Sequence, residues 1–386
     1  MDTSKTPKTE QTPTAPARRR RAASALAGAA LAALALTSCG GDAAGTSAAP
    51  AAGQAAADGA GHRVAFLVPD SSLRFVGVDA PHFAVRLAQR CPACTVDVLR
   101  AGDQAEQNAQ AEQALADGAD ALVVVAVNGE EAAPLAQAAA RDDVPVVAYD
   151  RFLPDAPLDL YTSFDGGAVG TLGGQAMLDA LGEDAGRGVV LWLNGDRTDN
   201  NAGLFAAGAH AILDGHVQVL EEHYVDNWSA DEARAVTERA LADLDGRRLV
   251  GVYTAYDGLA AGALKALDAA GLPPVPMTGQ DAEVAALQRI LAGTQTMTVY
   301  KDLPGLARTT ADLVLDVLEG RPVETTGTTP GTTPDGPGAV PTVLLQPQAV
   351  DRASIASTVL ADEFTTVDAL CAGAASRSCV EAGITG

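Results

Sequence analysis

From Arg63 onward, the sequence alternates short apolar runs with segments of helical periodicity. The runs Val64–Val68, Ala121–Val127 and Val144–Ala148 are almost continuously apolar instead of alternating apolar and polar residues. A continuously apolar strand is typical of a parallel sheet, because helices bury both of its faces. The pattern therefore predicts an α/β fold with helices on both sides of a parallel sheet.

The same alternation starts again after residue 160. Gly188–Leu193, Val217–Glu222 and Leu249–Tyr253 are expected to be strands, with helical segments between them. Two successive blocks of this kind predict two similar Rossmann-like lobes with parallel sheets, joined by a multi-strand hinge.

The chain is expected to cross between the lobes near Ser163, Lys301 and Val340. The N-terminal lobe then holds residues 62–163 and 302–340, the C-terminal lobe holds 164–301 and 341–361, and 362–386 form a C-terminal extension. The stretch 323–340 is rich in Thr, Gly and Pro, and we expect it to be a long irregular loop.

Residues 1–38 have the features of a secretion signal. Arg18–Arg21 provide a positive start, and Ala22–Leu36 is an apolar segment of about 15 residues, short for a membrane span. Leu36-Thr37-Ser38-Cys39 resembles the lipobox of bacterial lipoproteins, in which the cysteine is lipidated and becomes the first mature residue. The alternative is an ordinary signal peptide followed by an unrelated cysteine.

Residues 39–61 are rich in Ala and Gly and predict a flexible tether. We therefore expect an exported protein anchored by the lipid on Cys39 to the outer face of the cell membrane. The chain carries 49 Asp and Glu against 26 Lys and Arg, a formal net charge of −23. That charge disfavours nucleic acid and anionic lipid as partners, so membrane contact is expected only through Cys39.

Apart from Cys39, the cysteines form two close pairs, Cys91 with Cys94 and Cys371 with Cys379. Paired cysteines are common in exported proteins, which meet an oxidising environment. The Cys91-Pro-Ala-Cys94 spacing also occurs in redox proteins. Reactive cysteines of that type lie at a helix N-terminus, whereas this pair follows the expected helix Phe83–Arg90, so a structural bridge is favoured.

Polar side chains gather where the expected strands end, which is where open parallel sheets bind ligands. The candidates are Arg74, Asp150, Arg151, Asp199, Asn200, Tyr256, Asp257, Gln280, Asp281 and Lys301. Asp199 and Asp257 could instead be helix caps. Carboxylates and amides accept hydroxyl protons, whereas Arg and Lys donate to hydroxyl oxygens, so the set fits a small polyhydroxylated molecule. Phe75 and Trp228 could stack on an apolar ligand face, although core packing of Trp228 is an equal alternative.

Five sequence blocks carry a resemblance to a known family. AYDR (148–151), YTSFD (161–165), DNNAGLFAAGA (199–209), TGQDAE (278–283) and AGTQTMTVYK (292–301) resemble motifs of the D-xylose-binding protein family. These proteins are solute-binding subunits of ABC importers with the type I periplasmic-binding-protein fold. The resemblance extends from Arg63 to Ala361, and CPAC and the tail 366–384 resemble features of actinobacterial members.

The resemblance implies a site for D-xylose or a similar monosaccharide, delivered by a monomer to an ABC permease and its ATPase, with no cofactor and no metal. It implies sugar contacts from Arg74, Asp150, Arg151, Asn200, Asp257, Asp281 and Lys301, with Trp228 as the stacking residue. Tyr256 stands where the family usually has Asn, and the segment after Arg74 is divergent. The choice of sugar is therefore expected to depend on these two regions.

Three other classes of function compete with sugar import. A sugar sensor that presents its ligand to a chemoreceptor or histidine kinase would have the same sequence features. An enzyme is disfavoured because the chain has no G-x-S-x-G elbow and no Walker A loop. Related transcriptional repressors share the fold, but no helix-turn-helix sequence precedes residue 62. The grouped residues His216, Glu221, Glu222 and His223 lack the spacing of a zinc site.

Overall fold

A computed structural model describes residues 61–70 and 72–384 of the chain. The expected signal peptide 1–38, the lipidation site Cys39 and the expected tether up to residue 60 lie outside the described residues. Within the part of the chain that is described, no helix has the length and apolar character needed to cross a bilayer.

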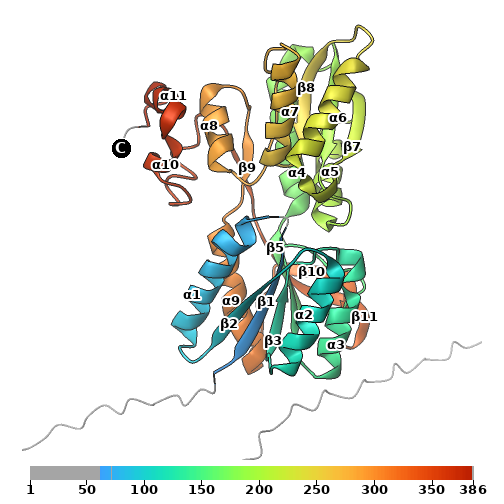
Figure 1. Cartoon of the computed structure of the whole chain (residues 1–386), viewed down its shortest axis with the longest axis vertical. Helices are drawn as coiled ribbons and strands as arrows, with labels where there is room; N and C mark the ends of the chain where they lie inside the picture. The colour runs from blue at the N-terminus through green and yellow to red at the C-terminus, as the bar shows by residue number, and fades with distance from the viewer. Residues whose placement is uncertain (1–60, 71, 385–386) are drawn as a thin grey trace, which may run out of the picture. The chain divides into compact units, whose positions relative to one another are not determined.

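The N-terminal lobe is built on a seven-stranded sheet with the order β10-β11-β5-β4-β3-β1-β2 (Figure 1). All neighbouring pairs are parallel except β10 and β11. The strands are β1 (Arg63–Pro69), β2 (Thr95–Ala101), β3 (Ala121–Val124), β4 (Val146–Tyr149), β5 (Leu160–Phe164), β10 (Gly327–Thr333) and β11 (Gly336–Leu345).

Helices cover both faces of this sheet, as the continuously apolar runs predicted. They are α1 (Ala80–Arg90), α2 (Gln104–Ala116), α3 (Ala133–Arg141) and α9 (Leu303–Glu319). Neighbouring residues of β1 enter different cores: Phe66 packs in the cluster that contains α1 and α9, and Leu67 packs in the cluster that contains α3. Both residues are fully buried, so β1 must be apolar on both sides.

The C-terminal lobe repeats the design with the strand order β7-β6-β8. Two isolated bridges, Val252 with Met277 and Gln280 with Val299, continue that sheet towards β9. The elements are α4 (Gly166–Leu181), β6 (Val189–Asn194), α5 (Asn200–Leu213), β7 (Gln218–Tyr224), α6 (Ala230–Ala242), β8 (Leu249–Thr254), α7 (Asp257–Ala269), α8 (Val284–Ala292), β9 (Thr298–Tyr300) and β12 (Gln348–Val350). The two-lobe α/β prediction is confirmed.

The segment 323–340 differs from its prediction as an irregular loop. Most of it forms the antiparallel hairpin β10–β11 at the edge of the N-terminal sheet. An edge strand tolerates Pro330, because a proline there need not donate to a neighbour on both sides, and threonine favours strands.

The hairpin also moves one of the crossings between the lobes. Strand β11 stays paired with β5 as far as Leu345, and β12 begins at Gln348 in the other lobe. The third crossing therefore lies at residues 346–347 instead of near Val340. The other two follow Phe164 and Lys301, close to the predicted positions.

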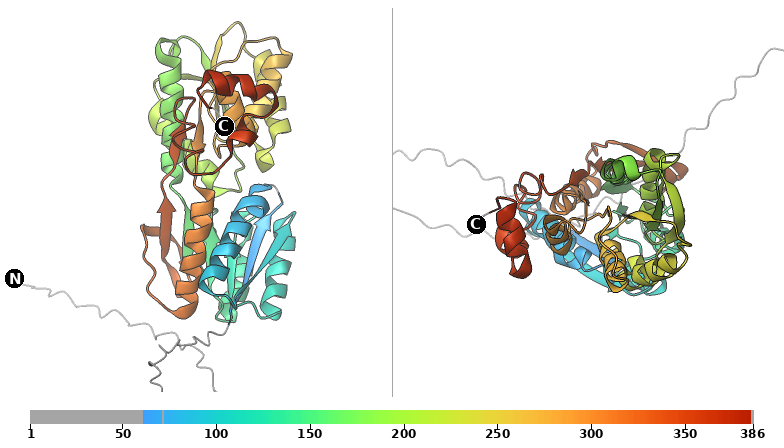
Figure 2. Two further views of the ribbon diagram at one scale, coloured as in Figure 1. Left: turned by 90° about the vertical axis from the view of Figure 1, so that its left-hand side faces the viewer. Right: turned by 90° about the horizontal axis from the view of Figure 1, so that it is seen from above.

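The C-terminal extension, drawn in red in Figure 2, packs against α8. It contains the short helices α10 (Val367–Leu370) and α11 (Ser376–Glu381). Cys371 and Cys379 are bonded within it, with Cα atoms 5.8 Å apart. Cys91 and Cys94 are also bonded, directly after the C-terminus of α1, which is the wrong end of a helix to activate a thiolate.

Helices α4 and α5 approach closely because glycines face the contact. A Cβ atom at Gly170 of α4 would collide with the backbone carbonyl oxygen of Phe205 on α5. Helix α5 also begins with residues of the site described below, so this contact fixes where they lie.

We expect Gly170→Ala to lower the free energy of unfolding by about 1–3 kcal/mol, because the backbone contact cannot make room for a methyl group. Gly203 on α5 is the matched control, since a Cβ there would meet open space. Gly203→Ala should raise the free energy of unfolding by about 0.5–1 kcal/mol through helix propensity. Urea denaturation measures both, and equal effects would contradict the close approach.

Candidate functional site

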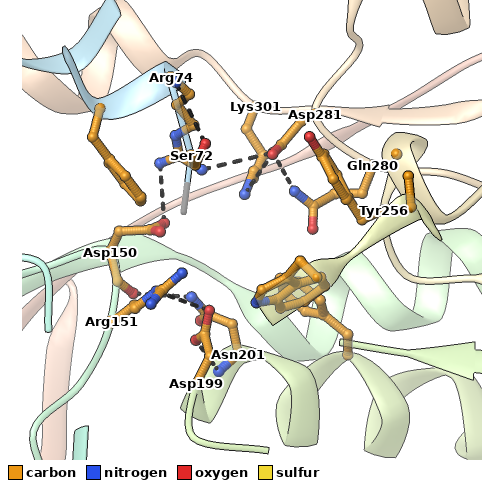
Figure 3. A pocket seen from close by; sticks show the side chains of 15 residues that line it. Ser72, Arg74, Asp150, Arg151, Asp199, Asn201, Tyr256, Gln280, Asp281 and Lys301 are labelled. Atoms are coloured by element: carbon orange, nitrogen blue, oxygen red, sulfur yellow. Dashed lines mark hydrogen bonds and ion pairs between the residues drawn. The ribbon is translucent and has the colours of Figure 1, made fainter. Parts of the chain in front are cut away.

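A cavity of about 190 Å³ lies where the two lobes meet. Figure 3 shows that side chains from both lobes point into it. Its lining consists of Ser72, Arg74, Phe75, Asp150, Arg151, Asp199, Asn201, Phe205, Trp228, Ala230, Tyr256, Gly258, Gln280, Asp281 and Lys301.

Arg74 is the centre of the charged part of the lining. It follows β1 at the start of one π-helical turn, Phe75–Asp79, and its side chain is 12% exposed. Its guanidinium contacts Asp79 at 3.2 Å and Asp150 at 3.2 Å in its own lobe, and Asp281 of the other lobe at 3.7 Å. A buried guanidinium needs such partners, because an unpaired buried charge is strongly unfavourable.

The same contacts determine the charges of these groups. Burial disfavours the cationic form of Arg74, but Asp150, Asp79 and Asp281 together raise its pKa well above the usual value. Burial would also raise the pKa of Asp150, but Arg74, Lys301 and Arg151 outweigh it and lower that pKa. Both side chains are therefore charged at neutral pH.

Asp79 supports Arg74 from behind. It is fully buried and accepts a hydrogen bond from the Tyr149 hydroxyl at 2.5 Å. Burial raises the pKa of Asp79, while Arg74 and Tyr149 counteract part of that rise. Asp79 does not line the cavity, so its role is to hold Arg74 in position.

Asp150 and Asp281 provide carboxylates from the two lobes in unusual backbone conformations. Their φ angles are +63° and +92°, in the region that residues other than glycine rarely adopt. Three side chains fix the Asp150 carbonyl: the Ser163 hydroxyl at 2.7 Å, and the Tyr161 hydroxyl and the Asn201 amide at 3.2 Å each. Strain of this kind is held by surrounding contacts and is typical of functional sites.

Lys301 completes the charged group from the end of β9. Its ammonium lies 2.9 Å from Asp281 Oδ1, and the side chain is 3% exposed. Gln280 also donates a hydrogen bond to Asp281. Asp281 therefore accepts hydrogen bonds from Lys301 and Gln280 of its own lobe and lies opposite Arg74 of the other lobe.

Arg151 joins the lobes on the other side of the cavity. Its Nη1 donates to the carbonyl of Ala126 at 2.9 Å, and its Nε lies 2.9 Å from Asp199 Oδ2. Asp199 also caps α5, because its Oδ1 accepts a hydrogen bond from the backbone N–H of Asn201 at 2.9 Å. Burial raises the pKa of Asp199, and Arg151 acts in the opposite direction.

Aromatic rings form the remaining wall. The Trp228 ring lies edge-on to Tyr256 with centroids 6.1 Å apart, and its centroid is 6.3 Å from that of Phe205. Phe75 lies beneath Arg74, with the guanidinium carbon 4.7 Å from the ring centroid. The cavity thus combines charged hydrogen-bonding groups with apolar faces, as a small polyhydroxylated ring requires.

All but two of the twelve sugar-contact candidates from the sequence line this cavity. Asn200 does not, because its Oδ1 accepts from the Phe152 amide at 2.7 Å. Asp257 does not either: it is fully buried and accepts from Gln295 at 2.8 Å and from the Glu283 amide at 3.0 Å. The prediction placed both in the site, whereas in the structure Asn200 joins the two lobes and Asp257 joins segments of the C-terminal lobe.

Five lining residues were not among the sequence candidates: Ser72, Asn201, Phe205, Ala230 and Gly258. Asn201 and Phe205 are four residues apart on α5, so one face of that helix meets the cavity. This spacing is visible in the sequence block DNNAGLFAAGA, but the spacing does not say which face of the helix meets the cavity. Within the described residues, no group of three or more His, Cys, Asp or Glu side chains is placed to hold a metal ion.

Comparison with known proteins identifies relatives over most of the chain. Residues 64–322 match the family model of the periplasmic binding protein domain. The D-xylose-binding periplasmic protein of Escherichia coli K12 is 35% identical over 269 residues, covering 68% of this chain and 79% of that protein. The multiple sugar-binding periplasmic receptor ChvE of Rhizobium radiobacter is 31% identical over 290 residues, covering 69% and 81%.

A solved structure with a similar fold is that of an ABC transporter solute-binding protein from Clostridium phytofermentans with bound β-D-glucose. It has a TM-score of 0.72 and 26% sequence identity, and the match covers 80% of this chain and 99% of that chain.

Burial raises the pKa of Asp257 to about 8, and the nearby Glu283 contributes to the rise while Gln295 opposes it. Because this pKa is higher in the folded than in the unfolded chain, the folded state binds the proton more tightly. Stability is then greatest below the unfolded-state pKa and falls as pH rises towards 8. Asp257→Asn removes this proton, so its free energy of unfolding relative to wild type should rise by up to about 1.4 kcal/mol per pH unit between pH 4 and 8.

Urea denaturation of wild type and Asp257→Asn at several pH values between 4 and 8 measures this difference. A difference that does not change with pH would show that Asp257 is ionised in the folded protein throughout the range.

Proposed function

Because this chain belongs to the periplasmic binding protein family, we propose that it is an extracytoplasmic sugar-binding protein of an ABC importer. It captures a monosaccharide, D-xylose or a close relative, and delivers it to the permease and its ATPase. The relatives that bind xylose or several sugars support the sugar class. A binding role leaves no need for catalysis, so a sugar incubated with the protein should be recovered unchanged.

The observation that carries the proposal is the pairing of Asp150 and Asp281 across the cavity. One carboxylate comes from each lobe, and cationic groups orient both. Two carboxylates with fixed oxygens can accept hydrogen bonds from several ring hydroxyls, while Arg74 and Arg151 can donate to hydroxyl or ring oxygens. Each charged hydrogen bond of this type contributes about 1.5–3 kcal/mol.

Contacts between the lobes support a capture mechanism by closure. The Asn201 amide donates to the Asp150 carbonyl, Asn200 accepts from Phe152, and the Gly129 amide donates to the Thr198 carbonyl at 3.2 Å. Each pair has one member in each lobe, next to the cavity. We propose that the lobes open at the three crossings to admit the sugar, and that the permease recognises the closed form.

The anchoring and export of the protein are part of the same proposal. A lipid on Cys39 would hold the protein at the outer face of the membrane, with residues 40–61 as the tether. Export also fits the two cysteine pairs, which would be oxidised outside the cytoplasm.

We expect Asp281→Asn to weaken binding of D-xylose by about 10- to 150-fold, because one charged hydrogen-bond acceptor is lost. Asparagine keeps the size of the side chain and tolerates the positive φ angle. Isothermal titration calorimetry measures the affinity, and circular dichroism checks the fold. Asp245→Asn is a matched control, since Asp245 also has a positive φ, +49°, but lies exposed, and it should bind as wild type does.

The same measurement on wild type with D-xylose, D-ribose, D-glucose and D-galactose tests the proposed ligand. Binding of none of these monosaccharides would contradict a sugar-binding function. Unchanged xylose affinity in Asp281→Asn would remove Asp281 from the site.

A further inference from the structure

The cavity has two chemically different sides. The charged groups Arg74, Asp150, Asp281 and Lys301 can bind hydroxyl groups. Another part of the lining presents the rings of Trp228 and Tyr256 together with Ala230 and Gly258. Figure 3 shows Tyr256 beside Gln280, away from Arg151 and Asp199. A sugar that places its hydroxyl groups on the charged side must place its least polar edge near these rings.

Tyr256 is held closely on two sides. It directly precedes α7, and its ring meets the Trp228 ring at an interplanar angle of 89°. On another side it covers Gly258, where even a Cβ atom would collide with the Tyr256 ring. The ring also packs on the core of the C-terminal lobe, beside Trp228. Its position is therefore fixed by packing.

A buried polar network fixes the hydroxyl end of the same side chain. The Tyr256 hydroxyl donates to Glu283 Oε1, and the Glu283 amide donates to Asp257 Oδ2 at 3.0 Å. Asp257 also accepts from Gln295 and from the Thr298 hydroxyl, at 2.8 and 3.0 Å. Arg289 donates to the Asp257 carbonyl at 2.8 Å.

This network gives Asp257 a role that differs from sugar contact. It lies behind the cavity wall, and its carboxyl group connects the start of α7 to the start of α8 and to β9. Through Glu283 it determines where the Tyr256 hydroxyl can go. The Tyr256 proton is already engaged, so the side chain offers the ligand a ring and no free donor.

We propose that Tyr256 makes the cavity selective for pentoses, with Glu283 and Asp257 as positioning residues. The fixed ring occupies the space that the exocyclic hydroxymethyl group of a hexopyranose requires. A pentopyranose has only hydrogens at that carbon and fits against the ring. This inference rests on the proposed sugar-binding function and specifies its substrate class.

The two sugars for the test are D-xylose and D-glucose, which differ only in that hydroxymethyl group. Calorimetric titration of the full mature chain should give a dissociation constant for glucose at least about tenfold higher than for xylose, in the range that one misfitting small group produces. Tyr256→Ala should lower this ratio at least about tenfold by opening the space. Tyr256→Phe keeps the ring and should retain the ratio, which separates volume from hydrogen bonding.

The positioning role needs a second pair of variants. Glu283→Ala releases the Tyr256 hydroxyl, so the glucose-to-xylose ratio should fall about threefold, less than in Tyr256→Ala. Glu283→Gln can still accept the hydroxyl proton and should restore the ratio. A loss of stability alone would weaken both sugars equally and leave the ratio unchanged.

The outcomes distinguish this inference from the function on which it rests. Wild type that binds neither sugar nor any other monosaccharide contradicts the function itself. Wild type that binds xylose and glucose equally well overturns the inference alone, and so does a folded Tyr256→Ala that keeps the wild-type ratio. If Tyr256→Ala does not fold, Tyr256→Asn and Tyr256→Leu, which also reduce the ring volume, provide the same comparison.

Discussion

The buried guanidinium of Arg74 is the interaction on which the rest of the site depends. It needs negative partners because it is almost completely removed from water, and it finds them in both lobes. Asp79 and Asp150 belong to the same lobe as Arg74, whereas Asp281 belongs to the opposite lobe. In the proposed opening and closing of the lobes, closure would therefore also complete the charge balance of the cavity. A ligand that bridges Asp150 and Asp281 with hydroxyl groups would stabilise the arrangement in which Arg74 is fully paired.

Two separate polar networks surround the cavity. The network centred on Arg74 lines the cavity and holds carboxylates and cations at fixed distances. The network centred on Asp257 lies behind the cavity wall and holds the aromatic wall through Glu283 and Tyr256. Hydrogen-bonding capacity and cavity shape thus depend on separate residues, and the two networks meet near Gln280, which forms the bridge to Val299 of β9. If Tyr256 sets the selectivity as proposed, changes in the second network would alter the sugar that is bound while the charged residues stay in place.

Backbone strain is concentrated at the same places. Asp150, Asp281 and Trp228 all have positive φ angles, and each lines the cavity. A fold tolerates such conformations only where surrounding contacts hold them, at a cost of order 1–3 kcal/mol each. Here the Asp150 carbonyl receives three side-chain donors, and the Asp281 amide donates to the Val299 carbonyl at 2.9 Å. The rigid sheets of the two lobes therefore present side chains that an ordinary strand end would not aim at the cavity.

The fold class could be predicted because burial on both faces of a strand leaves a direct signature in composition, as the continuous runs at β1 and β3 show. The location of the site followed from a second simple fact, that the carboxyl ends of parallel strands meet at one edge. The 323–340 hairpin was missed because Thr, Gly and Pro are common both in loops and in edge strands. The hairpin joins the sheet through the pairing of β11 with β5, which is far away in sequence.

By itself the sequence determined which chemistry is present: two lobes, a charged set at the strand ends, and aromatic residues near it. It could not determine which of two adjacent asparagines faces the cavity, because a shift of one residue along a helix rotates the side chain by about 100°. The tertiary structure directed Asn201 inward and Asn200 to the Phe152 backbone. In the same way the tertiary structure placed Asp257 in an internal network. The partners of Asp257, Gln295 and Thr298, reach it only when β9 lies beside α7 in the folded protein.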